Sequence, residues 1–247
     1  QRYFIEVAYK GTNYAGFQVQ PAGDTIQGRL ETALQTFYRK QFDLKCSSRT
    51  DSGVHARQNY FHTDTDALLS PRDVYHINAL LPRDIMVKNI LEVSPTAHSR
   101  FDAIARRYHY YLHTQPDPFI PDQSWYYPYP LNHSLLQDAA NIVLQTSDFT
   151  SFSKRNTQAK TMLCSLTASE WFFKEKQIIY VVHGNRFLRG MVKALVGTML
   201  QVGRGKITLN RFEEIIAARN CTLADFSTPA HGLFLEAVVF PPDYFTT

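Results

Sequence analysis

The sequence predicts an α+β fold made of two pseudo-duplicated halves with a mainly antiparallel sheet. Stretches with strand-like alternation and stretches with helical spacing follow one another over residues 1–100. A second series of similar size fills residues 101–247, and no run rich in Gly, Ser or Pro separates the two. We therefore expect an N-terminal half, 1–100, and a C-terminal half, 101–247, that form one rigid body.

Local signals place the elements of the first half. Residues 3–9 predict a strand that ends at a turn-forming run, Lys10-Gly11-Thr12-Asn13. Thr25 is a helix-capping residue type, and apolar residues follow it at helical spacing: Ile26, Leu30, Ala33, Leu34 and Phe37. Residues 58–63 and 84–93 again predict strands, and Ser70-Pro71 between them is typical of a helix start.

The second half repeats this alternation. Residues 105–114 predict a strand, on which alternation places Arg106, Tyr108, Tyr110 and Leu112 on one face. An ordered loop rich in Pro and Tyr is expected over 116–130, followed by a helix capped at Asn132 or Ser134. The remaining elements are a hairpin over 164–173 and 177–183, a helix over 187–202, a helix capped by Thr208, and a closing strand over 232–240.

Composition sets limits on function. The 247 residues carry 26 Lys and Arg against 22 Asp and Glu, and a net charge of +4 is weak evidence for a polyanionic partner. No apolar run is long enough to cross a bilayer and the first residues lack a signal-peptide pattern, so we expect a cytoplasmic protein without a membrane partner. Cys46, Cys164 and Cys221 lack metal-ligand spacing and are expected to be reduced thiols.

The most suggestive stretch for chemistry is Ser48-Arg49-Thr50-Asp51-Ser52-Gly53-Val54-His55-Ala56. Most loop aspartates serve only in turns or caps, and Asp51 taken by itself would be interpreted in the same way. Arg49 and His55 nearby would keep the carboxylate ionised, as a nucleophile requires. No metal motif is present; His109 and His113 fall four apart on a predicted strand, about 13 Å, which is too far to share one ion. His55 and His62 are expected to be surface or hydrogen-bonding residues.

Two further segments carry positive charge or aromatic rings. Arg186, Arg189 and Lys193 fall at i, i+3 and i+7 of the predicted helix, and Arg204 and Lys206 extend a run without acidic residues. This surface is either a solvated basic face or a track for phosphates. The strand with Arg106 and Tyr108 is either a packed sheet edge or a stacking platform for a flipped base.

These segments together resemble the tRNA pseudouridine synthase A family, whose catalytic loop is similar to the stretch around Asp51. The resemblance spans nearly the whole chain in order. It includes Tyr9-Lys10-Gly11-Thr12, Asn78-Ala79-Leu80-Leu81-Pro82, Arg100-Phe101-Asp102-Ala103, Arg107-Tyr108-His109-Tyr110, Asn185-Arg186-Phe187-Leu188, Met191-Val192-Lys193 and Pro229-Ala230-His231-Gly232.

The resemblance implies a pseudouridine synthase fold with two ferredoxin- or RRM-like halves that share a central, mainly antiparallel sheet flanked by helices. It implies a homodimer that isomerises uridines at nucleotides 38, 39 and 40 of the tRNA anticodon arm, with no cofactor and no metal. Asp51 would be the nucleophile, by attack on the sugar or the base, or it would remove a sugar proton.

The same resemblance implies the roles of the substrate-binding residues. Tyr108 would pack on the uracil or help to remove its C5 proton. Arg49 would fill the space that the base vacates, and Lys193 would be the counter-charge of Asp51. Arg106, Arg186, Arg189 and Arg204 are expected to contact the RNA backbone.

Some residues depart from the family pattern. Ser48 and Ser52 replace Gly and Ala, which are changes between small residues. Lys193 replaces an arginine, and Ser147 replaces a histidine. The alternatives are an inactive RNA-binding module on the same fold and an unrelated hydrolase that uses Asp51, which would need a second carboxylate that is not evident.

Overall fold

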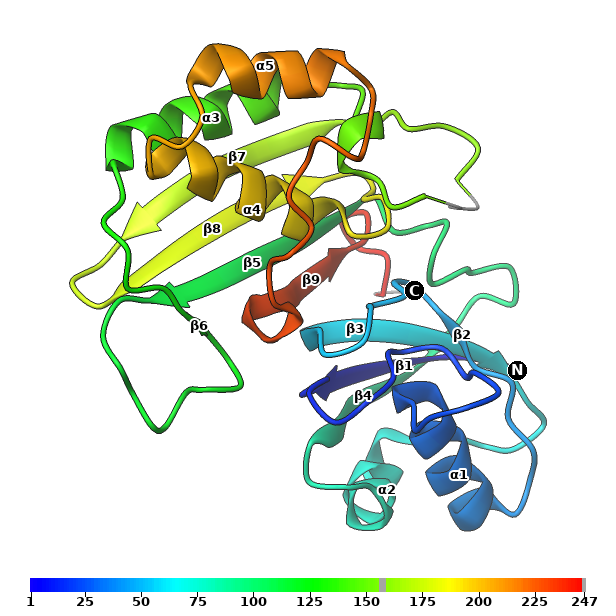
Figure 1. Cartoon of the computed structure of the whole chain (residues 1–247). Coiled ribbons are helices and arrows are strands. Elements are labelled where there is room, and N and C mark those ends of the chain that lie inside the picture. Colours follow the sequence, from blue (N-terminus) through cyan, green and yellow to red (C-terminus); the bar gives the residue numbers. More distant parts are fainter. Residues whose placement is uncertain (156–158, 246–247) are drawn as a thin grey trace. The chain divides into compact units, whose positions relative to one another are not determined.

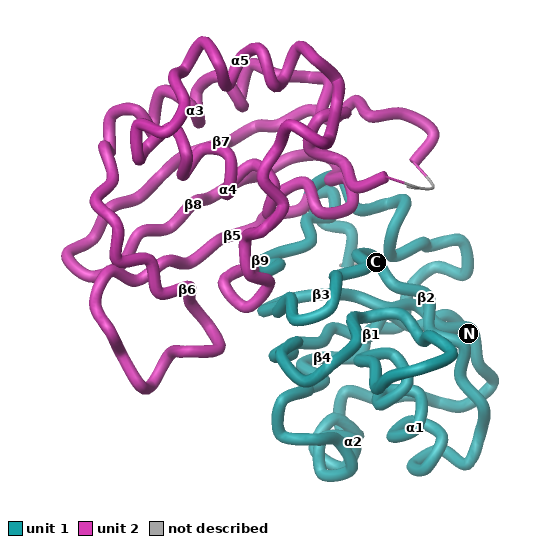
Figure 2. Tube along the Cα trace, in the orientation of Figure 1, with its two compact units in different colours: residues 1–105, 234–247 teal, residues 106–233 magenta. Residues whose placement is uncertain are grey.

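The computed structural model describes residues 1–155 and 159–245. The chain divides into two compact units, residues 1–105 with 234–247 and residues 106–233 (Figure 2). This division differs from the predicted halves, 1–100 and 101–247, in that the segment that begins at Phe234 belongs to the first unit. There β9 (Leu233–Val239) pairs in parallel with β3 (His55–Asp64) through His55↔Phe234 and Ala56↔Leu235. The single rigid body stays a prediction.

The first unit is a mainly antiparallel sheet with its helices on one face (Figure 1). Its strand order is β4-β1-β3-β9, and β2 pairs with β3. The remaining strands are β1 (Arg2–Tyr9), β2 (Lys45–Cys46) and β4 (Ile85–Val93), and the helices are α1 (Ile26–Tyr38), the short 3-10 helix η1 (Pro71–Asp73) and α2 (Val74–Leu80).

The capping signals of this unit are confirmed. Thr25 Oγ1 accepts the Gly28 N–H at 3.2 Å, and Ile26, Leu30, Ala33 and Leu34 form the buried stripe of α1. Ser70 and Asp73 form a reciprocal capping box, so the turn after Pro71 is a 3-10 helix that leads into α2. The two-residue strand β2 was not predicted, because two residues carry no periodicity.

The second unit has the same kind of architecture, with a sheet on which α3, α4 and α5 lie on one face (Figure 1). β5, β8 and β7 pair antiparallel in that order, and β6 pairs in parallel with β5. The strands are β5 (Ala105–His113), β6 (Trp125–Tyr126), β7 (Leu166–Phe173) and β8 (Gln177–Gly184). The helices are α3 (His133–Gln145), η2 (Thr150–Phe152), α4 (Met191–Gly203), α5 (Leu209–Ala217) and η3 (Ala230–Gly232).

The helix predicted from residue 187 begins four residues later. Its N-cap, Gly190, has a left-handed φ of 75°, which a helix interior does not allow, so Arg186 and Arg189 lie in the preceding segment. The prediction that Arg186, Arg189 and Lys193 share a helix face was therefore wrong. All residues of α4 except Lys193 and Gln201 are buried. Such a helix is a core element of the unit and not an amphipathic surface helix.

Gly197 in α4 lies in close contact with the segment around Asp225 and Thr228. A Cβ on Gly197 would lie 2.6 Å from Asp225 O and from Thr228 Oγ1, so only glycine fits there. Across the residues that the structure describes, no helix is long and apolar enough to span a membrane.

Candidate active site

The loop that carries Asp51 has a defined backbone. The Phe17 N–H donates to Thr50 O at 3.1 Å, and the Val54 N–H donates to Asp51 O at 3.1 Å. The second bond closes a β-turn from Asp51 to Val54 in which Gly53 has a φ of 78°. A positive φ at the third turn position favours glycine, which explains the residue type there.

Two glycines of the segment before α1 let it lie directly against this loop. A Cβ on Gly11 would stand 2.0 Å from Val54 O, and a Cβ on Gly16 would stand 3.3 Å from both Thr50 O and Ser52 N. Ser52 Oγ also donates to Tyr14 O at 3.0 Å. The Asp51 loop is therefore packed backbone to backbone, which leaves little freedom for it to move.

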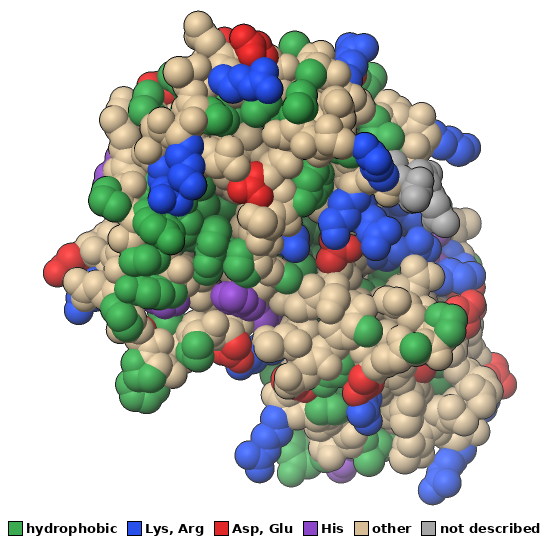
Figure 3. Space-filling view, in the orientation of Figure 1, with side chains coloured by type: hydrophobic (Ala, Val, Ile, Leu, Met, Phe, Trp, Pro, Cys, Tyr) green, Lys and Arg blue, Asp and Glu red, His purple; other side chains and the backbone are tan. Residues whose placement is uncertain are grey.

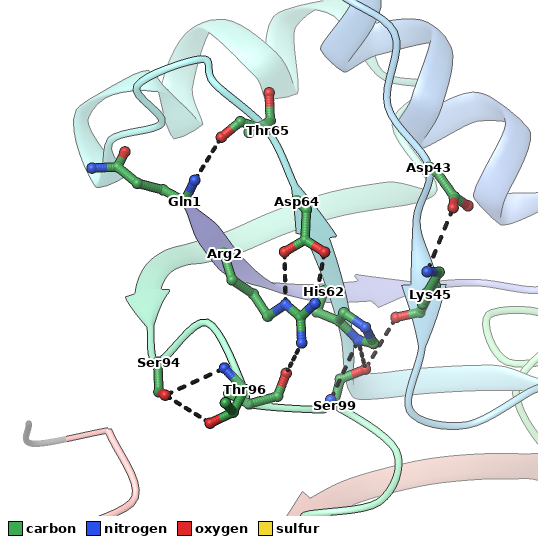
Figure 4. A network of polar contacts seen from close by, with 11 residues as sticks. Gln1, Arg2, Asp43, Lys45, His62, Asp64, Thr65, Ser94, Thr96 and Ser99 are labelled. Atoms are coloured by element: carbon green, nitrogen blue, oxygen red, sulfur yellow. Dashed lines mark hydrogen bonds and ion pairs between the residues drawn. The ribbon is translucent and has the colours of Figure 1, made fainter.

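A polar network anchors β2, the strand that leads into the loop (Figure 4). Ser99 Oγ donates to Lys45 O at 3.0 Å and lies 2.8 Å from His62 Nδ1. Beside it, Arg2 donates to both carboxylate oxygens of Asp64 at 2.7 and 2.6 Å, and to Ala97 O at 2.8 Å. The network thus fixes β2 next to the ends of β1 and β3.

The side chains of the loop differ in exposure. Arg49 is exposed and Asp51 is half-buried, whereas Ser48 and Thr50 are buried. Burial raises the pKa of the Cys46 thiol to about 11, against the charge and the hydrogen bond of Arg49, so Cys46 stays protonated at neutral pH. Arg49 and Asp51 are thus the two charged groups that the loop presents to solvent.

His55 and His62 are not surface residues; both are buried and hydrogen-bonded. His55 Nδ1 accepts the Gly11 N–H at 3.0 Å, and its ring lies 4.5 Å from the ring of Phe234. Burial lowers the pKa of His62 to about 4. His55 therefore helps to hold the end of the Asp51 loop, a function that its place in the sequence did not indicate.

In the second unit, Tyr108 and Arg106 contact the segment before α4. The ring of Tyr108 meets that of Phe187 edge to face, with centroids 5.0 Å apart, and Arg106 Nη1 donates to Asn185 O at 3.2 Å. Both side chains are half-buried, while Tyr110 and Leu112 on the same strand are fully buried. The predicted face of β5 is thus core at one end and accessible at the other.

Lys193 and Arg204 lie at opposite ends of α4. Lys193 is in the first turn, and the eleven residues to Arg204 correspond to about 16 Å along a helix. The guanidinium of Arg204 stacks 3.8 Å above the ring of Tyr129, and it lowers the pKa of Tyr127, which burial raises. Lys193 and Arg204 therefore cannot bind the same phosphate.

The surface of α5 in this unit carries charges of both signs. Figure 3 shows basic and acidic side chains next to each other over α5, where Arg211 pairs with Glu214 at 2.7 Å. Arg186 and Arg189 lie between β8 and α4, where the Lys154 N–H donates to Arg189 O at 3.0 Å. The structure thus brings Arg106, Tyr108 and the 185–189 segment together in one unit, and Arg49 with Asp51 in the other.

Comparisons with known proteins give the family. Residues 5–102 and 139–241 match the family described as tRNA pseudouridine synthase. Proteins called tRNA pseudouridine synthase A are 42% identical over 250 residues in Bacteroides fragilis and 40% identical over 241 residues in Azobacteroides pseudotrichonymphae. The matches cover 99% and 97% of this chain and 98% and 97% of the relatives. A Staphylococcus aureus protein of the same name is 36% identical over 240 residues, with 96% of this chain and 91% of that protein covered.

These matches place the protein among the isomerases that convert uridine to pseudouridine. The chain belongs to the tRNA pseudouridine synthase family. The predicted family, fold class and enzyme class are confirmed. The roles expected for the individual site residues stay predictions.

Proposed function

We propose that the protein isomerises uridine to pseudouridine at nucleotides 38, 39 and 40 of the tRNA anticodon arm, with Asp51 as nucleophile and without a cofactor. The observation that carries the proposal is a half-buried carboxylate on a backbone-packed loop, in a chain of this family. A reacting group needs such fixed geometry, because a misplacement of about 1 Å can cost a factor of roughly 100 in rate.

The reaction requires only rearrangement. The C1′–N1 bond breaks, the uracil turns, a C1′–C5 bond forms, the C5 proton leaves and N1 gains a proton. Asp51 adds to the sugar or to the base and is released again, so that the carboxylate is regenerated and no oxidant or external group enters. Arg49, next but one along the loop, occupies the space of the turned base.

The second unit supplies the groups that bind the nucleotide. Tyr108 packs on the uracil or helps to remove the C5 proton, and its edge-to-face contact with Phe187 holds its ring at a half-buried position. Lys193 supplies a cation for the carboxylate or for a phosphate. A lysine in the first turn of a helix is disfavoured by the helix dipole, and a nearby anion compensates for this.

The remaining cations bind the RNA backbone. Arg106, Arg186 and Arg189 belong to the region around Tyr108 and contact phosphates next to the target nucleotide. Arg204, at the other end of α4, contacts a phosphate further along the RNA. We also propose that the protein acts as a homodimer in the cytoplasm, which light scattering during size-exclusion chromatography and cell fractionation test.

The experiment that tests the proposal uses tRNA that contains 5-tritiated uridine. The purified protein should release tritium, because the C5 hydrogen is lost when C5 bonds to C1′. Transcripts in which nucleotides 38, 39 and 40 are all cytidine should release none, while transcripts with one uridine restored should release one equivalent. Equal release from the cytidine transcript would contradict the assignment to the anticodon arm. No release from any transcript would contradict the proposed activity itself.

A further inference from the structure

The buried side chains of the Asp51 loop alternate with the accessible ones. Ser48 and Thr50 are 8% and 7% exposed, whereas Arg49 is exposed and Asp51 is half-buried. The orientation of Arg49 and Asp51 therefore depends on what holds Ser48 and Thr50 in the interior. Two residues from neighbouring strands do so.

Asn59 of β3 holds Ser48. The Asn59 side chain is fully buried, and its Nδ2 donates to Ser48 O at 2.8 Å and to the Tyr9 hydroxyl at 3.2 Å. Its Oδ1 accepts the Tyr60 N–H at 2.9 Å. The amide therefore uses both hydrogens and its oxygen within the protein. A buried amide in a strand is uncommon, and full satisfaction of this kind makes its position well determined.

Tyr9 at the end of β1 holds Thr50. The Tyr9 hydroxyl lies 2.8 Å from Thr50 Oγ1, and both side chains are buried. The pairing of β1 with β3 changes register between Val7 and Tyr9, and such an irregularity re-aims the side chain that follows it. A continuous chain of hydrogen bonds thus runs from Ser48 through Asn59 and Tyr9 to Thr50. Ser48 and Thr50 are the two neighbours of Arg49 in the sequence.

We propose that Tyr9 and Asn59 are positioning residues for the isomerisation, which act on Asp51 through Thr50 and Ser48 without touching the substrate. This inference depends on the proposed role of Asp51. Loss of one bond would leave a buried polar group without its partner and let the loop relax. Because a small displacement of a reacting group has a large effect on rate, the loss should appear in turnover more than in binding.

The test compares isosteric variants in the full-length protein. Tyr9→Phe and Thr50→Val both remove the hydrogen bond between Tyr9 and Thr50, and Tyr9→Phe also removes the one that Asn59 Nδ2 donates to the Tyr9 hydroxyl. Thr50→Ser keeps the hydroxyl. Tyr180→Phe is the matched control, because the buried Tyr180 hydroxyl lies 2.8 Å from Ser169 Oγ within the sheet of the second unit. Tritium release from tRNA gives kcat and KM, and thermal unfolding gives Tm.

We expect kcat to fall about 10- to 100-fold in Tyr9→Phe and Thr50→Val, with KM within about threefold of wild type. The double variant should be no slower than Tyr9→Phe alone, because Tyr9→Phe already removes the bond that Thr50→Val removes. Thr50→Ser should recover most of the rate. Tyr180→Phe should lower Tm similarly but leave kcat within about twofold.

A Tyr9→Phe enzyme with wild-type kcat, or a loss no larger than that of Tyr180→Phe, would overturn the inference. If Tyr9→Phe does not fold, Thr50→Val measures the same bond and decides the matter. Failure of the proposed function gives a different result, since wild type would then release no tritium or Asp51→Ala would still release it.

Discussion

Gly11 offers a sharp test of how the Asp51 loop is held. Its backbone φ lies outside the left-handed region, so glycine is needed there for space and not for conformation. In Gly11→Ala the new methyl group would stand 2.0 Å from Val54 O and 2.7 Å from Val54 C. Real contacts of this kind are more than 1 Å longer, so one of the two backbones must move apart from the other.

The cost follows from what this separation breaks. The Gly11 N–H donates to His55 Nδ1 at 3.0 Å, and His55 is fully buried. An unpaired buried group costs about 1–3 kcal/mol, and overpacking adds about 1–3 kcal/mol. We therefore expect Gly11→Ala to lower the free energy of unfolding by about 2–6 kcal/mol. For a chain of this length that lowers Tm by roughly 5–20 °C.

The matched control is Gly205→Ala. Gly205 has a φ of 68°, and a Cβ there would have no atom within 4 Å, so its cost is left-handed strain alone, about 1 kcal/mol. Urea unfolding of both variants measures the difference, and tritium release should be lost in Gly11→Ala under conditions where it is still folded. A Gly11→Ala protein as stable as Gly205→Ala would refute the close packing of the loop.

Three further outcomes are expected. Tyr108→Phe keeps the ring but removes the hydroxyl that would help to remove the C5 proton, so it should reduce tritium release far more than tRNA affinity; a wild-type rate would remove this hydroxyl from the chemistry. Arg186→Glu with Arg189→Glu should weaken tRNA binding and reduce the slope of log affinity against log salt concentration by about 1–2, whereas Arg211→Glu on α5 should not. An unchanged slope would show that Arg186 and Arg189 are solvated and do not contact phosphates. Burial lowers the pKa of His62 to about 4, so the stabilisation by its neutral ring is complete above pH 6.5 and is lost as pH falls toward 4. Between pH 7.5 and pH 5 the free energy of unfolding should therefore fall by about 2 kcal/mol. Urea unfolding of His62→Gln should not show this fall.

The sequence predicts those features of the fold that short stretches determine. Thr25, Asn132 and Thr208 each cap the helix that follows, since a cap depends on contacts within three residues. The start of α4 was missed because Phe187 and Leu188 continue the apolar spacing of the helix. Only the left-handed backbone of Gly190 ends it, and a single glycine does not reveal its φ in the sequence.

Long-range pairing accounts for what else was missed. The parallel pairing of His55 with Phe234 joins residues that lie far apart in the chain, and no local pattern encodes it. The supports of Asp51 were also missed. Asn59 gave one usable signal, because asparagine is disfavoured inside a strand and there implies a polar partner. Tyr9 gave none, since a tyrosine at a strand end is ordinary.

The role of Asp51 as the nucleophile is tested by tritium release from Asp51→Asn, measured beside Asp51→Ala on the same tRNA. Asparagine keeps the shape of the side chain and removes only its charge, so the loop should stay folded and tRNA affinity should remain within about tenfold of wild type, because phosphate contacts dominate binding. With either variant we expect no tritium release and no pseudouridine at nucleotides 38, 39 and 40. Continued turnover by Asp51→Asn or Asp51→Ala would contradict the assignment of Asp51 as the nucleophile.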